Sequence, residues 1–398
     1  MNLPVLRLKP NADRRLRSGH LWIYSNEVDT KATPLGDFQM GDQVIVENAN
    51  GKPMGVAALN PQQLVCARIV SRDTGYSLDK SLLIHRLKVA LSLRENLFES
   101  PFYRLINAEA DLLPGLEIDR FGDVFSVQIS TQAMERLKDS IVEALVKSCK
   151  ARTIIWRNDL PNRDLEGLEK YLETAYGDDD DAVEVIENGI RYVSPLLLKK
   201  RAPWNYDQRL NRARLADYVQ GKRVLSLYAG VGDWALNAAV NGASQVVCLE
   251  HSQDLTDVLL ANAEDNHVAD LIECYQGDVL AGLDTLKSTE ERFDIILADP
   301  PDFIRRKKDF KTGEAGYRRL YEGAMRLLAK DGLFMVSTRS LFFSQEEMQS
   351  SLLASARHLD RNLQVLERQG QSPDVPAHPA IAESSYLKHF ICRILPNS

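Results

Sequence analysis

Apolar residues in the C-terminal half of the chain fall into short continuous runs, separated by longer stretches with helical spacing. Continuous apolar runs are typical of strands in a sheet that helices cover on both faces. From about residue 185 the pattern therefore predicts an α/β domain with a mainly parallel sheet. Its strands are expected at residues 223–228, 245–250, 272–276, 293–298, 332–337 and 387–394.

The first 75 residues show a different pattern, in which short apolar segments alternate with turn residues. Residues 44–46 and 54–59 flank the turn Asn48-Ala49-Asn50-Gly51, and residues 64–70 form a further apolar segment. Asparagine and glycine between two apolar segments favour a β-hairpin. A small β-barrel is the natural fold for such a segment.

Between these two parts, helical and strand patterns are mixed. Helical spacing extends over residues 82–97 and 134–149, whereas 124–129 and 153–156 are typical of strands. Four aspartates at 178–181 repel one another and mark a linker or an exposed loop. Because 398 residues are too many for one core, we predict three domains. They are a β-barrel over 1–75, an α+β domain over 76–184 and the α/β domain over 185–398.

The composition restricts the environment and the partners. A net charge of −7 argues against a protein that coats nucleic acid, although it leaves room for a local basic face. Five scattered cysteines without a Cys-x-x-Cys pair predict neither a disulfide framework nor a metal site, and they fit the reducing cytoplasm. No apolar run reaches the roughly 20 residues of a membrane span, so we expect a cytoplasmic protein without a membrane partner.

A basic face of this kind lies near the N-terminus. Arg14, Arg15 and Arg17 surround the single acid Asp13, and an aromatic stretch that contains Trp22 follows. Basic residues beside aromatic ones suit phosphate contact and base stacking, which makes these side chains candidates for RNA binding. The same composition fits a solvated charged turn before a core strand equally well.

The most informative motif is the stretch 224–236, where an apolar run precedes Gly230-Val231-Gly232 and a helical pattern follows it. Glycines there let the backbone approach a ligand closely. Glu250 ends the next run, 20 residues after Gly230, where a carboxylate can bind both hydroxyls of a ribose. Asp278 ends the third run and can reach an adenine amino group. The series predicts a nucleoside cofactor, with Tyr228 and Asp233 beside the glycines.

The fourth apolar run ends in Asp299-Pro300-Pro301, a stiff turn that can hold a methyl acceptor. It favours S-adenosylmethionine (SAM) over a dinucleotide, as does alanine at position 235 in place of a third glycine. Asp299 is therefore a candidate for the cofactor side and for the acceptor side. The basic run Arg305, Arg306, Lys307 and Lys308 follows and could hold RNA phosphates, although such a run is more often a solvated face. An α/β domain that has lost its ligand is the alternative.

These motifs resemble the large-subunit ribosomal RNA methyltransferase I family over nearly the whole chain. The resemblance implies a Rossmann-like methyltransferase domain, an RNA-binding PUA domain at the N-terminus, SAM as cofactor and 5-methylcytosine in ribosomal RNA as product. The segments that carry it are Gly-His-Leu-Trp-Ile-Tyr-Ser-Asn-Glu at 19–27, residues 103–106 and 113–123, Tyr-Asp-Gln-Arg at 206–209, His-Pro at 378–379 and Tyr-Leu-Lys at 386–388.

The resemblance also implies a cysteine that attacks C6 of the base, since this attack makes C5 nucleophilic. The family carries it in a Ser-Cys-Ser-like loop, where this chain reads Ser337-Thr338-Arg339-Ser340. Arg339 stays protonated and cannot be the nucleophile. Cys248, Cys274 and Cys392 are expected inside strands, so the nucleophile is unassigned. Further departures lie at Lys200-Arg201-Ala202-Pro203, Ser226-Leu227-Tyr228, Asp233 and Asp302.

Three functions remain open at this point. The first is methylation of cytosine C5 in large-subunit ribosomal RNA, and the second is methylation of another acceptor such as a base amine. The third is RNA or ribosome binding without catalysis. The intact set of Gly230, Gly232, Glu250 and Asp278 favours a SAM-dependent RNA methyltransferase. The sequence does not decide the oligomeric state, and a homodimer is one possibility.

Overall fold

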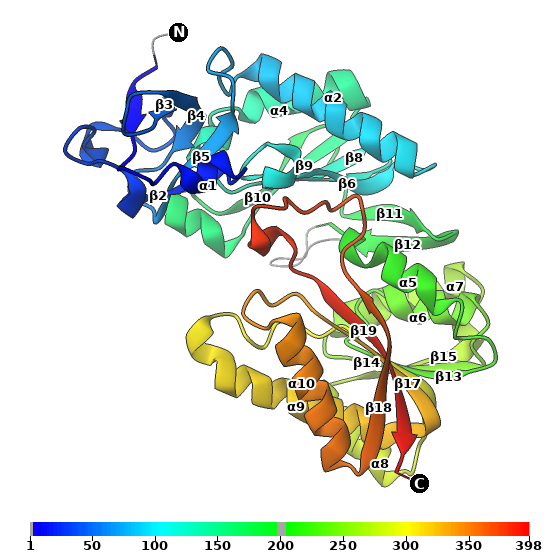
Figure 1. The fold of residues 1–398 in the computed structure, drawn as a ribbon. Coiled ribbons are helices and arrows are strands. Elements are labelled where there is room, and N and C mark those ends of the chain that lie inside the picture. Colours follow the sequence, from blue (N-terminus) through cyan, green and yellow to red (C-terminus); the bar gives the residue numbers. More distant parts are fainter. Residues whose placement is uncertain (1–2, 197–203, 398) are drawn as a thin grey trace. The chain divides into compact units, whose positions relative to one another are not determined.

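The computed structural model describes residues 3–196 and 204–397, drawn in Figure 1. Contacts between residues divide the chain into two compact units, which we describe separately. Unit 1 comprises Met1–Val183, Pro195–Tyr206 and Asp374–Ser384, and unit 2 comprises Glu184–Ser194, Asp207–Pro373 and Ser385–Ser398. The change of pattern expected near residue 185 lies beside the boundary between Val183 and Glu184. The finer division into three domains stays a prediction.

Unit 1 begins with a five-stranded sheet of order β1-β3-β4-β5-β2. A bridge between Leu8 and Val28 links the segments that follow its two edge strands, as a small barrel requires. The predicted hairpin at residues 44–59 is confirmed, with Gly51 at a φ of +80° in its turn. The elements are β1 (Val5–Arg7), α1 (Arg14–Arg17), β2 (Trp22–Tyr24), η1 (Ser25–Glu27), η2 (Leu35–Asp37), β3 (Gln43–Glu47), β4 (Pro53–Leu59) and β5 (Val65–Ser71).

A second five-stranded sheet of unit 1 has the order β10-β9-β8-β7-β6, and α2 and α4 pack together. The predicted helix over 82–97 is confirmed as α2, whose N-cap Asp79 accepts a hydrogen bond from the Leu82 N–H. The expected helix over 134–149 is instead two helices, because Leu137 has a non-helical backbone. The elements are α2 (Lys80–Leu97), β6 (Phe102–Asn107), η3 (Ala108–Asp111), β7 (Leu116–Phe121), β8 (Val124–Ile129), α3 (Gln132–Glu135), α4 (Lys138–Cys149), β9 (Thr153–Asn158), η4 (Pro161–Glu166) and β10 (Tyr171–Tyr176).

The acidic run connects this sheet to a hairpin that the sequence analysis missed. Asp178 and Asp179 are exposed outside regular structure, which confirms the predicted exposed loop. Arg152 forms ion pairs with Asp178 and Asp180. The hairpin that follows consists of β11 (Ala182–Glu187) and β12 (Ile190–Pro195).

Unit 2 is built on a seven-stranded sheet of order β15-β14-β13-β16-β17-β19-β18. The first five strands in this order are parallel, and β19 runs antiparallel to both β17 and β18. All six predicted strands are present, and the predicted mainly parallel sheet is confirmed. The strands are β13 (Arg223–Leu227), β14 (Gln245–Glu250), β15 (Ile272–Gln276), β16 (Phe293–Ala298), β17 (Leu328–Thr338), β18 (Arg361–Gln369) and β19 (Lys388–Pro396).

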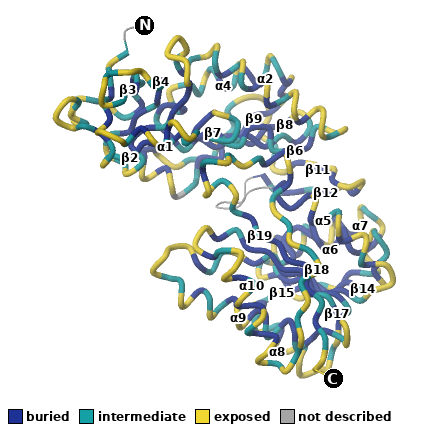
Figure 2. Tube along the Cα trace, viewed as in Figure 1, coloured by how far each residue is buried: buried dark blue, intermediate teal, exposed yellow. Residues whose placement is uncertain are grey.

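Helices cover both faces of this sheet, and Figure 2 shows its central strands β13, β14 and β16 as mostly buried. Apolar side chains of α8, α9 and α10 form one core with the sheet, while α5, α6 and α7 lie on the other face. The helices are α5 (Arg209–Leu215), α6 (Asp233–Val240), α7 (Gln253–Asp265), α8 (Val279–Ser288), α9 (Phe310–Leu327) and α10 (Gln345–His358), with the short turns η5 (Tyr206–Gln208), η6 (Ala269–Leu271) and η7 (Lys307–Asp309). The short turn η8 (Ala382–Ser384) belongs to unit 1.

The strand order reverses between β13 and β16, because β14 and β15 lie on one side of β13 and β17 on the other. In open α/β sheets, ligands bind outside the carboxyl ends of the strands at such a switch point. The glycine turn follows β13, and Asp299-Pro300-Pro301 follows β16. Both motifs therefore lie at the position where this fold binds ligands.

Candidate functional site

The glycine turn has the backbone geometry expected of a ligand-binding loop. Tyr228, Gly230 and Gly232 all have positive φ, and α6 begins directly after Gly232. A Cβ at Gly232 would clash with the side chain of Leu236, so this position requires glycine. Burial raises the pKa of Tyr228 to about 12, and its ring packs against the core. The conformation of the turn is thus fixed by the packing of its side chains and by its glycines.

Glu250 lies at the carboxyl end of β14 and is buried. Its Oε2 accepts the Gly230 N–H at 2.8 Å, and its Oε1 accepts the Ser252 N–H at 3.0 Å. Each carboxylate oxygen has a second lone pair, so both can still accept a hydroxyl proton. Glu250 therefore joins the ends of β13 and β14 and can also hold a ribose.

Asp278 lies at the carboxyl end of β15, one residue beyond Gly277. Its Oδ1 accepts the Ala281 N–H at 2.9 Å and so caps α8. A cavity of about 400 Å³ adjoins it, with Leu249, Leu286 and Gly282 among its walls. A flat apolar ring with an amino group fits this combination of apolar walls and one carboxylate.

Asp233, at the start of α6, has a partner within the protein. Its Oδ2 accepts a hydrogen bond of 3.0 Å from Nη1 of Arg212, a fully buried residue that also binds both carboxylate oxygens of Glu187. Burial lowers the pKa of Arg212, but the charges of Glu187 and Asp233 outweigh it and raise the pKa above its ordinary value. The cluster connects α5, α6 and β11, and a contact of Asp233 with the cofactor stays a prediction.

At the predicted acceptor side, the largest set of ion pairs is centred on Arg339, which follows β17. Its Nη1 and Nη2 donate to Oδ1 and Oδ2 of Asp299 at 2.8 and 3.2 Å. Its Nε and Nη2 donate to Oδ2 and Oδ1 of Asp207 at 2.8 and 3.1 Å. The exposed fractions are 23% for the Arg339 side chain, 7% for Asp207 and 9% for Asp299. One guanidinium thus binds two nearly buried carboxylates where the family resemblance implied a cysteine.

Neighbouring groups fix this ion-pair cluster further. The Arg339 N–H donates to Oδ1 of Asp302 at 3.2 Å, and the Tyr386 hydroxyl donates to Oδ2 of Asp207 at 3.3 Å. Burial lowers the pKa of Arg339, but Asp207 and Asp299 raise it well above its ordinary value. The guanidinium therefore stays charged and has no electron pair to offer a base.

No cysteine lies on the loops that follow β16 and β17. Cys248 lies within β14, Cys274 within β15 and Cys392 within β19, as predicted. Cys392 belongs to the core, and burial raises the pKa of its thiol to about 12. The remaining two cysteines, Cys66 and Cys149, are buried in unit 1. The structure therefore offers no substitute thiolate at this end of the sheet.

The two groups of predicted RNA-binding residues differ in exposure and in how many of their charges form ion pairs. Arg305, Arg306, Lys307 and Lys308 are all exposed, and only Arg306 forms an ion pair, with Asp309 at 2.8 Å. In unit 1, Arg14 is exposed, Arg17 pairs with Asp13, and Arg15 lies over the Tyr24 ring and hydrogen-bonds to Glu27. Trp22 is half-buried, and its Nε1 donates to Glu109. RNA contact by these residues stays a prediction.

Comparisons with known proteins now identify the family. Residues 6–72 match the family described as a PUA-like domain, and residues 212–351 match the one described as conserved hypothetical protein 95. The ribosomal RNA large subunit methyltransferase I of Aliivibrio fischeri (strain MJ11) is 32% identical over 394 residues, which cover 98% of this chain and 98% of that protein. The chain belongs to the ribosomal RNA large subunit methyltransferase I family.

Solved structures support the same fold for this family member. SMU.776, assigned as a methyltransferase and crystallised with SAH, superposes with a TM-score of 0.84 at 22% identity, covering 98% of this chain and all of that one. A second structure, assigned as a SAM-dependent methyltransferase from Streptococcus mutans, gives a TM-score of 0.83 at 21% identity with the same coverage. By family and fold the chain is a SAM-dependent methyltransferase with a PUA-like N-terminal domain and a Rossmann-like sheet.

The groups at the carboxyl edge fit SAM. Glu250 keeps lone pairs for the ribose hydroxyls, and Asp278 adjoins a cavity with apolar walls. The bound cofactor would supply an electrophilic methyl group, while Gly230, Gly232 and Glu250 would hold its nucleoside near the Asp299 turn. These residue assignments remain predictions for this methyltransferase.

A buried polar chain beside the site was not predicted from the sequence. Asn211 Nδ2 donates to Gln208 Oε1 at 2.6 Å, and Gln208 Nε2 donates to Ser337 Oγ at 2.8 Å. Ser337 Oγ also forms a hydrogen bond of 2.8 Å with Nδ1 of His389, whose direction depends on the tautomer of the imidazole. The imidazole stacks on Trp234 with ring centroids 5.6 Å apart. A lone histidine within the apolar run at 387–394 was the available signal.

His389 makes the stability of this methyltransferase depend on pH. Burial lowers its pKa to about 4, although Asp299 and Glu367 oppose the shift. Since the folded pKa lies below the unfolded value of about 6.5, stability is lost as pH falls from about 6.5 towards 4. From pH 7.5 to pH 5 the loss assigned to His389 is about 2 kcal/mol. Urea unfolding of His389→Phe and of the wild type should show this difference in pH dependence, and parallel curves would contradict it.

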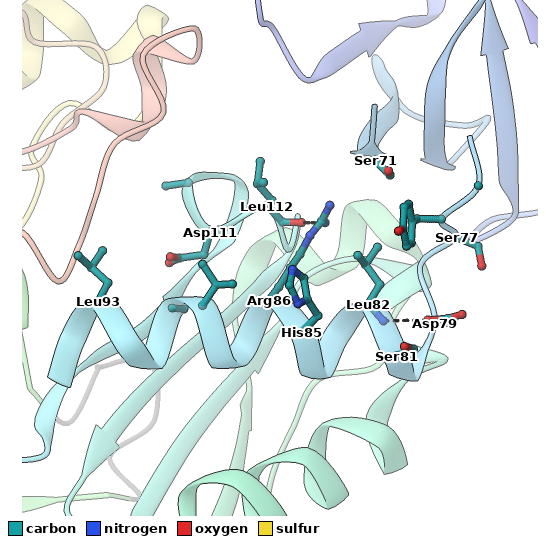
Figure 3. Close-up of a pocket in the computed structure, with 15 residues that line it drawn as sticks. Ser71, Ser77, Asp79, Ser81, Leu82, His85, Arg86, Leu93, Asp111 and Leu112 are labelled. Atoms are coloured by element: carbon teal, nitrogen blue, oxygen red, sulfur yellow. Dashed lines mark hydrogen bonds between the residues drawn. The ribbon is translucent and has the colours of Figure 1, made fainter. Parts of the chain in front are cut away.

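Unit 1 contains a separate cavity of about 840 Å³, shown in Figure 3. It lies between α2 and the segments around Ser71 and Leu112, and Arg86 donates hydrogen bonds to the carbonyls of Val70 and Leu112. None of the residues predicted to bind cofactor or RNA lines it.

In residues 3–196 and 204–397, no cluster of acidic, histidine or cysteine side chains could hold a metal ion. No helix in the same residues is long and apolar enough to span a membrane.

Proposed function

We propose that the chain transfers a methyl group from SAM to a heteroatom of large-subunit ribosomal RNA that carries its own lone pair. The observation that carries this proposal is the guanidinium of Arg339, which binds Asp207 and Asp299 at the position of the expected cysteine. Methylation at cytosine C5 needs an enzyme nucleophile that adds to C6. A base amine or ring nitrogen needs none, because its own electron pair attacks the methyl group.

The RNA substrate is supported by family membership, by the PUA-like domain at residues 6–72 and by the exposed basic run after the Asp299 turn. Phosphates of an RNA substrate suit a run of exposed cations. Cytoplasmic RNA is consistent with the cysteines, all of which are free thiols.

A second candidate is RNA binding without catalysis. It is favoured by the same ion pairs, because Asp299 is already bound to Arg339 where an acceptor would have to lie. Under this alternative the cofactor pocket would be retained without turnover. The two candidates differ in whether a methyl group reaches RNA, which one experiment can measure.

The test compares large-subunit ribosomal RNA from a strain lacking this gene with that from its parent. We expect purified protein to transfer labelled methyl from SAM to the deproteinised RNA of the deletion strain. Mass analysis of the nucleosides should give a methylated nucleoside other than 5-methylcytidine. A 5-methylcytidine product would contradict the proposed acceptor. Absence of label in RNA, together with measured SAM binding and RNA binding, would establish the non-catalytic alternative.

A further inference from the structure

We propose that the outer face of α9 extends the basic run into a phosphate-binding track for the RNA that flanks the target nucleotide. The track comprises Lys307, Lys308, Lys311 and Arg318. The sequence pattern predicted RNA binding for the first two, and the structure adds Lys311 and Arg318. It deepens the proposed function, since it rests on an RNA substrate. It does not depend on the identity of the methylated atom or on catalysis.

The packing of α9 determines which of its side chains face solvent. Tyr317, Leu320, Tyr321 and Ala324 belong to the core that α9 shares with the sheet. Lys311 and Arg318 are exposed and lie seven residues apart, which is two turns of an α-helix. Lys308 lies in η7, three residues before Lys311, and is also exposed. Basic residues thus follow one another along a single exposed surface.

The charges on this surface are largely uncompensated. Three other basic residues nearby have acidic partners: Arg306 pairs with Asp309, Arg319 with Asp284 and Arg326 with Glu322. Among the described residues, Lys307, Lys308, Lys311 and Arg318 form no ion pair. Glu314 is the acid that lies between them on α9, and it is half-buried. In a chain with a net charge of −7, four unpaired cations on one short surface form a local site for polyanions.

The position of the track connects it with the acceptor site. The segment between β16 and β17 begins with the Asp299 turn, continues through the basic run and becomes α9. Helix α9 therefore leads away from the carboxyl edge of the sheet. Lys311 and Arg318 are about 10 Å apart along its axis, enough to face several phosphates of one RNA strand. RNA whose target base lies near Asp299 could place its flanking backbone along this surface.

The test measures how RNA affinity depends on salt for Lys311→Gln/Arg318→Gln. The probe is fluorescein-labelled large-subunit ribosomal RNA transcript, titrated at potassium chloride concentrations from about 50 to about 200 mM. Each lost phosphate contact lowers the slope of log affinity against log salt by about 0.7 to 0.9. We therefore expect the double variant to lower the slope by about 1.5, with unchanged SAM affinity by calorimetry.

The matched control is Lys330→Gln/Arg357→Gln, which removes one lysine and one arginine that are also exposed. Lys330 lies at the start of β17 and Arg357 at the end of α10, towards the amino edge of the sheet. This control should retain the wild-type slope. A wild-type slope for Lys311→Gln/Arg318→Gln, or an equal loss in the control, would overturn the track. If the wild type does not bind the transcript, the RNA substrate and the track both fail. If it binds with the expected slopes but transfers no methyl group, only the proposed catalysis fails.

Discussion

Replacing Arg339 with alanine is expected to lower the free energy of unfolding by about 3 kcal/mol or more. The substitution leaves Asp207 and Asp299 nearly buried without the guanidinium that binds all four of their oxygens. Removing one partner of a buried ion pair is costly because the remaining charge keeps its desolvation penalty. Urea unfolding at pH 7.5 measures the difference, and Arg318→Ala is the control, because Arg318 is exposed and forms no ion pair with the residues that the structure describes.

A combined substitution separates the charge effect from loss of packing. Asp207→Asn/Asp299→Asn removes both carboxylate charges. Introducing Arg339→Met into this double variant should destabilise it far less than Arg339→Ala destabilises the wild type. Arg339→Lys keeps one charge but lacks the planar fork, and it should lie between the wild type and alanine. An Arg339→Ala variant as stable as the wild type would show that the cluster contributes little.

Arg339→Cys addresses the reaction rather than the stability. The thiol would stand where the resemblance places the family nucleophile, but it would lie beside two carboxylates that have lost their counter-charge. Negative neighbours disfavour the thiolate and raise the pKa of a thiol. We therefore expect this single substitution to yield no 5-methylcytidine when labelled RNA is digested to nucleosides and analysed by mass.

The sequence predicted those elements best whose apolar residues form continuous runs. Three strands, β14, β15 and β16, have the predicted bounds, because strands with helices on both faces need little alternation. The hairpin β11–β12 and strand β18 were missed, since more and less exposed residues alternate along them one by one. Such short alternating segments of mixed polarity resemble loops in a sequence pattern. The single helix expected over 134–149 was wrong because apolar spacing continues across the break at Leu137.

Prediction of the site was limited in a different way. The spacing from Gly230 to Glu250 is a local pattern, and the structure joins these two residues by a hydrogen bond. The partner of Arg339, Asp207, lies 132 positions away in the chain. No periodicity signals an ion pair over that distance, although position 339 itself could be singled out by the resemblance. The resemblance therefore singled out position 339, and the structure gives the partners of the arginine that lies there.

Replacing Glu250 with alanine is expected to weaken SAM binding about 100-fold or more. The carboxylate would lose hydrogen bonds to two ribose hydroxyls, and a hydrogen bond to a charged group contributes about 1.5–3 kcal/mol. The N–H groups of Gly230 and Ser252 would also lose their acceptor, which loosens the glycine turn. Calorimetry with SAM measures the loss. Asp254→Ala is the matched control, since this acid is exposed on α7 four residues further along.

Glu250→Gln separates the charge from the shape of the side chain. It keeps one acceptor oxygen for the turn and should bind SAM with intermediate affinity, provided that thermal melting shows an intact fold. RNA affinity and its salt dependence should be unchanged in both Glu250 variants, because Glu250 is buried behind the glycine turn and distant in sequence from the basic run. Wild-type SAM affinity in a folded Glu250→Ala variant would remove Glu250 from the cofactor site. The polar contacts to the cofactor would then have to come from the glycine turn and Asp278 alone.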